Sequence, residues 1–548
     1  MSHSYRPTYH ASIPSGWCND PNGTIFYNGK AHLFFQHYPH KAEWGTMHWG
    51  HFTTQDFVHW TQLPVALVPD RDYEVICGCC SGSAIEKDGA LYLMYTAAQP
   101  DLQRQCLAKS TDGGVTFVKD EANPILTADM LSDEVSSFDF RDPRLFIKDG
   151  CYYFLAGARV IKPESIEAVR EERAKKKAAA PLPSSSIRYT PSAGEIREQE
   201  DGSDSEEAAF AAGSGAKIKS PSLGDVFGIN PEKDGYGNLI LCRSHDLMHW
   251  EYVGYLLHRQ PRFEEDFYEL NGVYECPDYI VLDGQEVVLS SPQNLPQIGN
   301  CYQNVHSGLY ILGKLDFETG RYDVEKIGEL DSGFDFYAAQ SLHMPDGRTI
   351  MIAWKEMWDR NYPSQAEGWA GTYTFPREFS MCDGDLVQKP VRELDAFCKN
   401  RTACDFLSVS GDAVCVKGVS GNTIRLRVTM EPGTASRAGV KLFAGNEHET
   451  VVYYDAEEGV LAVDRSKSGI KITGKEDNVN VRKLDIGHPE SINLEMLLDI
   501  SSLELFVNGG KHVMTANVYP DPEDMGVLFF AESGDACFRD IEKFDVVV

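Results

Sequence analysis

Long apolar segments are missing from this sequence. No stretch approaches the length of a membrane span, and the opening residues, MSHSYRPTYHASIPSGW, contain no apolar core like that of a secretory signal. We therefore expect a cytoplasmic protein with no membrane partner. In that compartment the 14 cysteines are expected to remain free thiols rather than to form disulfides.

Paired clusters of metal ligands are also missing. The run Cys77-Gly78-Cys79-Cys80 is the densest group of cysteines, but no second cluster follows it at the spacing of a zinc site. Unliganded thiols are the favoured interpretation of this run. The sequence predicts no metal site at this run.

Basic residues are scarce relative to acidic ones. There are 51 Lys and Arg residues against 82 Asp and Glu residues, which gives a formal net charge of −31 at pH 7. Nucleic acids and anionic membrane surfaces carry the same sign of charge and would repel such a protein. We therefore expect no nucleic-acid partner and favour a neutral or diffusible ligand.

What the chain does contain is a repeated strand-and-turn pattern. A turn ending in Gly precedes a short strand of aromatic and β-branched residues, as in hairpins. The five turns are Asn28-Gly29, Asp88-Gly89, Asp149-Gly150, Asp283-Gly284 and Asp346-Gly347. Three of the four spacings are about 60 residues, a period typical of blade-like repeats. The pattern predicts a five-bladed β-propeller over residues 1–394, whereas unrelated hairpins in a sandwich would not explain the period.

The remaining spacing is longer because it contains residues 163–225. This segment runs from EAVREERAKKKAAA through PLPSSS to EQEDGSDSEEAAFAAGSG, a composition that cannot bury a core. Disorder or a loose excursion is the expected state of this insertion.

The periodic turns stop near residue 395. Strand-like segments such as TIRLRVTM, VVYYDA and LELFVNGG then alternate with turn residues up to residue 548. This pattern predicts an all-β protein whose propeller is followed by a β-sandwich over residues 395–548. A mainly structural role is favoured for the sandwich, and a sugar contact or a surface for homo-oligomers stays open.

Equivalent positions of the repeat are expected to converge on the propeller axis, because the innermost strand of each blade lines it. Counting back seven to nine residues from each turn gives five side chains: Asp20, Ser81, Asp142, Glu275 and Tyr337. Three carboxylates, a hydroxyl and a phenol facing one axial pocket would suit a polyhydroxylated ligand.

Each carboxylate also has a structural interpretation. Asp20 lies in WCNDPNG (17–23), where it could cap a tight turn, although the indole of Trp17 favours a sugar-binding group. Asp142 could form a stabilising ion pair with Arg141, which would also hold its pKa low. Glu275 has Tyr274 and Cys276 as neighbours, and apolar surroundings would raise its pKa and suit a general acid. Two carboxylates with separated pKa values are what glycosidic-bond cleavage requires.

Together these motifs resemble glycoside hydrolase family 32, the β-fructofuranosidases, over nearly the whole chain. The matching segments are WCNDPNG (17–23), WGTMHWGHFTTQDFVHW (44–60), SGSA (81–84), FRDP (140–143), ECPD (275–278), DFYAAQ (335–340) and GWAGTYTFPRE (368–378). Cys18 stands where the family usually has Met or Leu, and Cys80 stands where it usually has an aromatic residue.

The resemblance implies that Asp20 is the nucleophile, Glu275 the acid/base and Asp142 the carboxylate that holds the fructosyl hydroxyls. It further implies a substrate-binding set, to which the motif positions add Trp17 and Cys80: Trp17, Asn19, Gln36, Trp44, Cys80, Ser81, Arg141, Tyr337 and Trp358. The implied activity is retaining hydrolysis of sucrose, sucrose 6-phosphate or short fructo-oligosaccharides, and it requires no metal and no organic cofactor. A fructosyltransferase, a fructan exo-hydrolase (inulinase or levanase) and a non-catalytic sugar-binding propeller are the alternatives.

Overall fold

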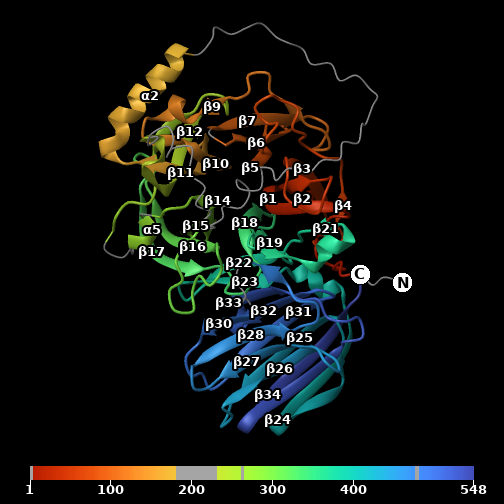
Figure 1. Cartoon of the computed structure of the whole chain (residues 1–548). Coiled ribbons are helices and arrows are strands. Elements are labelled where there is room, and N and C mark those ends of the chain that lie inside the picture. The colour runs from red at the N-terminus through yellow and green to blue at the C-terminus, as the bar shows by residue number, and fades with distance from the viewer. Residues whose placement is uncertain (1–3, 101, 180–230, 261–264, 269, 475–479) are drawn as a thin grey trace, which may run out of the picture.

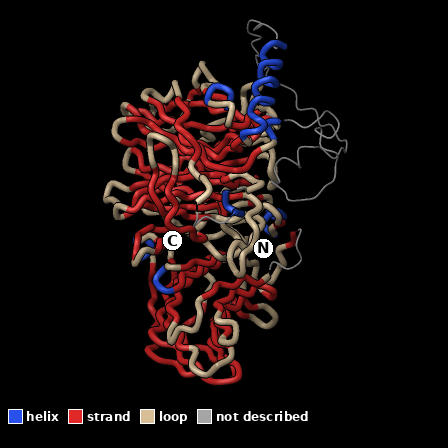
Figure 2. The backbone as a smooth tube through the Cα atoms, turned by 90° about the vertical axis from the view of Figure 1, so that its left-hand side faces the viewer, coloured by secondary structure: helices blue, strands red, loops and turns tan. Residues whose placement is uncertain are grey.

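The computed structural model describes residues 4–100, 102–179, 231–260, 265–268, 270–474 and 480–548. Five antiparallel sheets form one domain, and a larger curled sheet forms the other (Figure 1). Strands dominate both domains, as Figure 2 shows in red. The prediction of an all-β, five-bladed propeller followed by a second β domain is confirmed.

Each blade is a meander of four antiparallel strands. Blade 1 contains β1 (Gly16–Tyr27), β2 (Lys30–Tyr38), β3 (His48–Thr54) and β4 (Thr61–Gln62), with β21 (Trp369–Ala370) added parallel to β1. Blade 2 contains β5 (Gly78–Lys87), β6 (Ala90–Gln99), β7 (Leu102–Ser110) and β8 (Val118–Lys119), with β9 (Leu126–Thr127) beside β7. Blade 3 contains β10 (Val135–Lys148), β11 (Cys151–Ile161), β12 (Gly235–Ser244) and β13 (Glu251–Tyr255).

The last two blades complete the ring. Blade 4 contains β14 (Tyr274–Leu282), β15 (Gln285–Pro292), β16 (Leu309–Leu315) and β17 (Tyr322–Glu329). Blade 5 contains β18 (Tyr337–His343), β19 (Thr349–Trp354), β22 (Arg377–Cys382) and β23 (Asp385–Pro390). The first strands of the blades pack in the cyclic order β1, β5, β10, β14, β18 and back to β1. These five strands therefore surround the axis.

The repeated turns join the first and second strands of the blades. Four of the five turns have positive φ at both residues, for example 50° at Asn28 and 78° at Gly29. This is the backbone of a tight hairpin turn, which Asn-Gly and Asp-Gly pairs adopt at low cost. The hairpins predicted from these turns are confirmed.

The second domain is one continuous sheet of ten strands that curls on itself. Its order is β30-β28-β27-β26-β34-β25-β31-β32-β33, with β24 beside β34. The strands are β24 (Cys398–Ser420), β25 (Thr423–Glu431), β26 (Arg437–Ala444), β27 (Glu449–Asp455), β28 (Val460–Lys467), β30 (Val481–Asp485), β31 (Ile492–Asp499), β32 (Ser502–Val507), β33 (His512–Asn517) and β34 (Gly526–Val546). A single apolar core fills the space between the two halves of the curl.

The two domains share apolar and charged contacts. Phe35 and Phe375 of the propeller belong to the same buried cluster as Phe506 and Val513 of the second domain. Arg377 on β22 is fully buried and donates hydrogen bonds to Glu504 on β32 at 2.7 and 3.1 Å. A two-stranded sheet of β20 (Arg360–Asn361) and β29 (Thr473–Gly474) adds a further link.

The beginning of the insertion is helical, which corrects the expectation of a loose segment from residue 163. Helix α2 (Ile166–Ala179) projects at the far end of the propeller from the curled sheet (Figure 1). It is anchored by Val169, which is buried, and by Arg173, whose guanidinium donates to the carbonyl of Val135 at 2.6 Å. The prediction of a loose segment was based on overall composition. It did not take into account that one apolar and one charged side chain could be buried against the propeller. The part of the insertion after residue 179 falls outside the described residues up to 230.

The other described α-helices are single turns, α1 (Ala128–Leu131) and α5 (Glu265–Tyr268). Among the described helices, none has the length and apolar character that crossing a membrane requires. All 14 cysteines lie in the described ranges and are thiols.

Candidate active site

A break in strand pairing occurs at the same place in every blade. The hydrogen-bonded register shifts between Cys18 and Pro21, Cys80 and Gly82, Arg141 and Arg144, Glu275 and Asp278, and Tyr337 and Gln340. A bulge of this kind bends a strand and redirects the side chains next to it. The backbone has positive φ at Asp142 (61°), Cys276 (46°) and Ala338 (55°), which is uncommon for residues other than Gly.

The bulges surround a cavity of about 240 Å³ at the end of the inner strands. Ten of the residues that the sequence nominated line this cavity: Asn19, Asp20, Gln36, Trp44, Cys80, Ser81, Arg141, Asp142, Glu275 and Trp358. Three carboxylates from three different blades therefore face the same space. The other two nominated residues, Trp17 and Tyr337, are buried behind the cavity wall.

Asp20 is buried, and only one of its two carboxylate oxygens has a hydrogen-bond partner among the described residues. Its Oδ2 accepts a hydrogen bond from the Ser81 hydroxyl at 2.8 Å and contacts the Cys276 thiol at 3.5 Å. Its Oδ1 has no hydrogen-bond partner within the described part of the chain. Burial, and then the charge of Glu275, raise the pKa of Asp20 above its ordinary value.

The carboxylate oxygens of Glu275 have polar partners, where partly apolar surroundings were expected. Its Oε1 accepts hydrogen bonds from Arg141, with Nε at 3.0 Å and Nη2 at 2.9 Å. Its Oε2 accepts a hydrogen bond from the Tyr337 hydroxyl at 2.5 Å. The expectation failed because it used neighbours in sequence. The Tyr274 hydroxyl bonds to the carbonyl of Phe267, and the polar partners of Glu275, Arg141 and Tyr337, come from other blades.

Asp142 is not held at low pKa by Arg141, which corrects a second expectation. The guanidinium hydrogen bonds go to Glu275 and, at 2.9 Å, to Asp139. Asp142 instead accepts the backbone N–H of Cys276 at 3.0 Å. Burial, and then the charge of Glu275, raise the pKa of Asp142, and the nearby positive charge of Arg141 does not overcome them.

Trp17 and Tyr337, which lie behind the cavity wall, hydrogen-bond to wall residues. Trp17 donates from Nε1 to Asn19 Oδ1 at 2.8 Å, and its ring lies 6.0 Å from the ring of Trp358. Tyr337 fixes one oxygen of Glu275. On the wall itself, Gln36 donates to the carbonyl of Cys79 at 3.0 Å, and burial raises the pKa of the Cys80 thiol.

Sequence reasoning missed five residues of the wall: Met47, Ala98, Gln103, Asp139 and Gln293. Asp139 could have been found, because it precedes Arg141 by two positions and shares its strand face. Met47 precedes β3 within the segment WGTMHWGHFTTQDFVHW (44–60), so that motif could have indicated it. Ala98, Gln103 and Gln293 lie on or next to second and third strands, where no motif was found. Gln103, for example, lies on β7 and accepts the backbone N–H of Phe140 at 2.8 Å.

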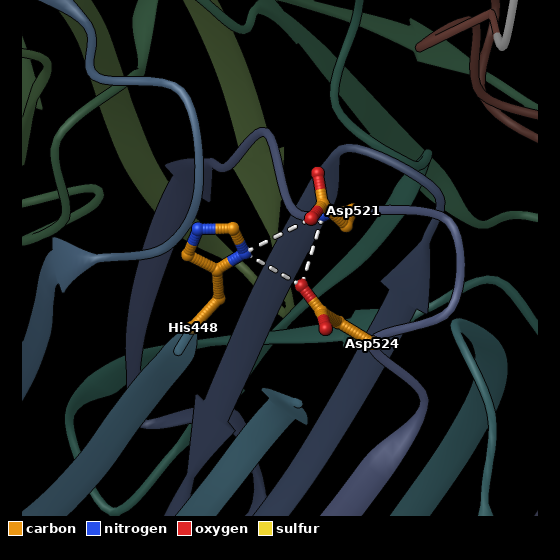
Figure 3. Close-up of side chains that lie close together, drawn as sticks. All are labelled: His448, Asp521 and Asp524. Carbon is orange, nitrogen blue, oxygen red and sulfur yellow. Dashed lines mark hydrogen bonds and ion pairs between the residues drawn. The ribbon is translucent and has the colours of Figure 1, made fainter. Parts of the chain in front are cut away.

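One group of side chains outside this cavity has the composition of a metal site. His448, Asp521 and Asp524 of the second domain lie close together (Figure 3). The His448 Nδ1 atom is 2.9 Å from Asp524 Oδ2 and 3.6 Å from Asp521 Oδ2. The backbone N–H of Asp521 also donates to Asp524 Oδ2. These contacts connect two loops of the curled sheet.

The family of the chain follows from comparison of the whole sequence with known families. The model of the glycosyl hydrolases family 32 N-terminal domain matches residues 10–167 and 226–390, and that of the family 32 C terminal matches residues 393–546. The chain belongs to glycosyl hydrolase family 32. It is a β-fructofuranosidase-type glycoside hydrolase.

Individual relatives agree with this family 32 assignment. The chain is 30% identical to a sucrose-6-phosphate hydrolase of Zymomonas mobilis, covering 99% of this chain and 93% of that protein. The structure of a sucrose-6-phosphate hydrolase from Lactobacillus gasseri is similar with a TM-score of 0.74, 25% identity and coverage of 99% and 93%. A family 32 β-fructofuranosidase from Bombyx mori has a TM-score of 0.69, 27% identity and coverage of 99% and 94%.

Proposed function

We propose that this family 32 enzyme releases terminal β-D-fructofuranosyl units from sucrose, sucrose 6-phosphate or short fructo-oligosaccharides, with retention of configuration. The observation that carries the proposal is the convergence of Asp20, Asp142 and Glu275 on one small cavity. A cavity of about 240 Å³ is smaller than typical drug-sized pockets, which favours the end of a short substrate over the middle of a polymer.

In the proposed mechanism, Asp20 attacks C2 of the fructosyl unit while Glu275 protonates the glycosidic oxygen. The fructosyl–Asp20 ester is then hydrolysed by a water molecule that gives its proton to Glu275. The unpartnered Oδ1 of Asp20 supports its role as nucleophile, because that oxygen can approach carbon without first losing a hydrogen bond. Ser81 holds the other oxygen and so fixes the carboxylate plane.

Asp142 is proposed to bind the fructosyl hydroxyls and stabilise the positive charge of the oxocarbenium-like transition state. The Cys276 N–H fixes its Oδ2 and supports this assignment. Among the other nominated residues, Asn19, Gln36, Trp44, Arg141 and Trp358 are proposed to contact the sugar. Trp17 and Tyr337 are proposed to act through Asn19 and Glu275, which they hydrogen-bond.

The test is an assay of sucrose, sucrose 6-phosphate, 1-kestose and inulin, which follows both free fructose and new oligosaccharides. We expect fructose as the main product from at least one short substrate. Mainly oligosaccharide products would favour the fructosyltransferase alternative, and faster turnover of inulin would favour a fructan exo-hydrolase. No turnover of any of the four would refute the proposal.

The nucleophile is tested separately with Asp20→Asn. We expect hydrolysis to fall by at least about four orders of magnitude, as for other essential nucleophiles, with sugar binding retained. Asp149→Asn, in an exposed hairpin turn of blade 3, is the matched control and should keep full activity. In Glu275→Gln, mass spectrometry with an activated fructoside should detect a protein heavier by one fructosyl unit. Full activity of Asp20→Asn would contradict the assignment.

A further inference from the structure

Three arginines converge where the propeller meets the second domain, and we call them the arginine cluster. Arg360 lies on β20 of the propeller, whereas Arg465 and Arg482 lie on β28 and β30 of the curled sheet. Each of the three residues is at most 5% exposed. The guanidinium carbons of Arg465 and Arg482 lie 3.9 and 4.9 Å from the centroid of the Phe334 ring. In a chain with a net charge of −31, such a concentration of buried positive charge requires an explanation.

Two of these arginines have partners for most of their N–H groups. Arg360 donates from Nη1 to Asp335 at 2.9 Å and from Nη2 to the side-chain oxygen of Asn304 at 2.9 Å. Arg482 donates from Nε and Nη2 to the same Asn304 oxygen at 3.2 and 2.8 Å, and from Nη1 to the carbonyl of Val481 at 3.2 Å. One neutral amide oxygen therefore accepts hydrogen bonds from two guanidinium groups.

Arg465 has one edge without partners. Its Nη1 donates to Asp335 at 2.6 Å and to the carbonyl of Asn517 at 3.0 Å. Its Nε and Nη2 atoms are buried and have no hydrogen-bond partner among the residues that the structure describes. These are neighbouring N–H groups of a planar fork, the arrangement with which arginine binds an anion through two donors. We call them the open edge of Arg465.

The carboxylates at the arginine cluster do not balance its charge. Within the described ranges, Asp335 and Asp359 are the carboxylates at ion-pair distance from the three arginines. Asp335 is fully buried and pairs with both Arg360 and Arg465. Asp359 Oδ1 lies 3.5 Å from the Nε atom of Arg360, and the two atoms form no hydrogen bond. Three guanidinium groups therefore face two carboxylates, which leaves one positive charge in excess.

The pKa values of neighbouring groups agree with this excess. Burial, and then the positive charges of Arg360 and Arg465, lower the pKa of Arg482 to about 9. Burial also raises the pKa of Glu329, a further carboxylate near Arg482, to about 7, so Glu329 is only partly ionised at neutral pH. The Glu329 oxygens accept hydrogen bonds from a backbone N–H and a hydroxyl group instead of an arginine. Glu329 therefore does not neutralise the arginine cluster.

We infer that the arginine cluster binds a small monovalent anion such as chloride at the open edge of Arg465. A buried charge without a partner is unfavourable, and an anion would accept both N–H groups and supply the missing negative charge. Water would accept the same hydrogen bonds but would leave the charge in excess. Because the cluster contains residues of both domains, the bound anion would stabilise the junction between them. None of the three arginines lines the cavity that contains Asp20, so the inference does not depend on the proposed function.

Bromide is the probe for the site, because it is chemically similar to chloride and can be located by its anomalous X-ray scattering. Crystals of the full chain are grown without halide and soaked in sodium bromide. We expect an anomalous peak within about 3.5 Å of both Nε and Nη2 of Arg465, the distance of a hydrogen bond to an anion. Water at the open edge without an anomalous peak would overturn the inference. This measurement uses the wild-type protein and so does not depend on the folding of a variant.

Thermal unfolding separates a built site from accidental binding. The unfolding temperature is measured in sodium bromide and in sodium gluconate at equal ionic strength, and the difference between the two salts is compared among variants. Because a ligand of the folded state stabilises it, this difference should be about 2 °C larger in the wild type than in Arg465→Met once bromide reaches about 100 times its dissociation constant. Arg377→Met removes a buried arginine outside the cluster and should keep the wild-type difference. A bromide peak without the loss in Arg465→Met would mean an adventitious ion only and would also overturn the inference.

Discussion

Tyr337 on β18 donates a hydrogen bond to Glu275 on β14, with 2.5 Å between the phenol oxygen and Oε2. The two residues come from neighbouring blades, and each lies at the bulge of its inner strand. The bond holds the proposed acid/base toward the cavity from behind. Arg141 of a third blade holds the other carboxylate oxygen.

Tyr337→Phe is predicted to lower kcat by about 10- to 100-fold, the loss expected when a hydrogen bond to a charged group is removed. The ring and its packing remain, so thermal unfolding should change little. Steady-state kinetics with sucrose measures the effect. Tyr27→Phe is the control, because that phenol bonds to the carbonyl of Gly89 in an outer turn. Equal losses in both variants would show that Tyr337 acts only on stability.

Asp142→Asn is predicted to stabilise the protein at pH 7 by about 1–3 kcal/mol while abolishing activity. A carboxyl whose folded-state pKa is raised loses stability as pH rises through that pKa, and an amide does not. The difference in unfolding free energy between Asp142→Asn and the wild type should therefore shrink as pH falls toward 4. Thermal unfolding across this pH range measures it. A constant advantage at every pH would show that ionisation is not its cause.

Glu356→Gln is predicted to flatten the decline of stability from pH 5 to pH 8. Burial raises the pKa of Glu356 to about 8, and its Oε2 accepts no hydrogen bond from the described residues. Between its unfolded pKa and 8 the native state binds one more proton than the unfolded state, so stability falls as pH rises. At pH 8 the unfolding free energies of Glu356→Gln and the wild type should differ by on the order of 3 kcal/mol.

Urea unfolding at several pH values measures the effect of Glu356→Gln. The amide oxygen can still accept the N–H of Gly371, which Glu356 binds at 2.8 Å. Glu457→Gln, at an exposed position of the second domain, is the control and should leave the pH dependence unchanged. Parallel pH curves for wild type and Glu356→Gln would contradict the prediction.

Arg377→Met is predicted to destabilise the protein by about 3–5 kcal/mol, because it leaves buried carboxylates without their partner. Arg377 contacts Glu504 of the second domain and Asp331 of the propeller. Although burial acts in the opposite direction, Arg377 and then His10 lower the pKa of Glu504 to about 2. Calorimetry should show a lower unfolding temperature.

The control for Arg377→Met is Arg392→Met. Arg392 also pairs with a carboxylate, Glu378, but its side chain is 64% exposed, and exposed pairs contribute at most about 1 kcal/mol. A similar effect of the two substitutions would show that burial of the Arg377 pairs is not important.

The sequence alone determined the two-domain β architecture and the convergence of ten of the twelve nominated residues on one cavity. Asn-Gly and Asp-Gly turns specify hairpins through local backbone preference, and their regular spacing reports the number of blades. Asp20, Asp142 and Glu275 could be nominated because each lies seven or eight residues before its turn, and a propeller brings such positions together.

Only the tertiary structure decided which charged groups pair, how the carboxyl pKa values shift, and which further residues line the cavity. Arg141 could pair with Asp142 or with Glu275. The bulge after Arg141 decides for Glu275, and the residues adjacent in sequence do not reveal this choice. Gln103 reaches the cavity from the third strand of its blade, and Gln293 from the end of a second strand. The pKa values of Asp20 and Asp142 follow from burial next to Glu275, a contact between blades that are distant in sequence. Local patterns specify turns and strands, whereas charge interactions depend on distances that exist only after the ring has closed.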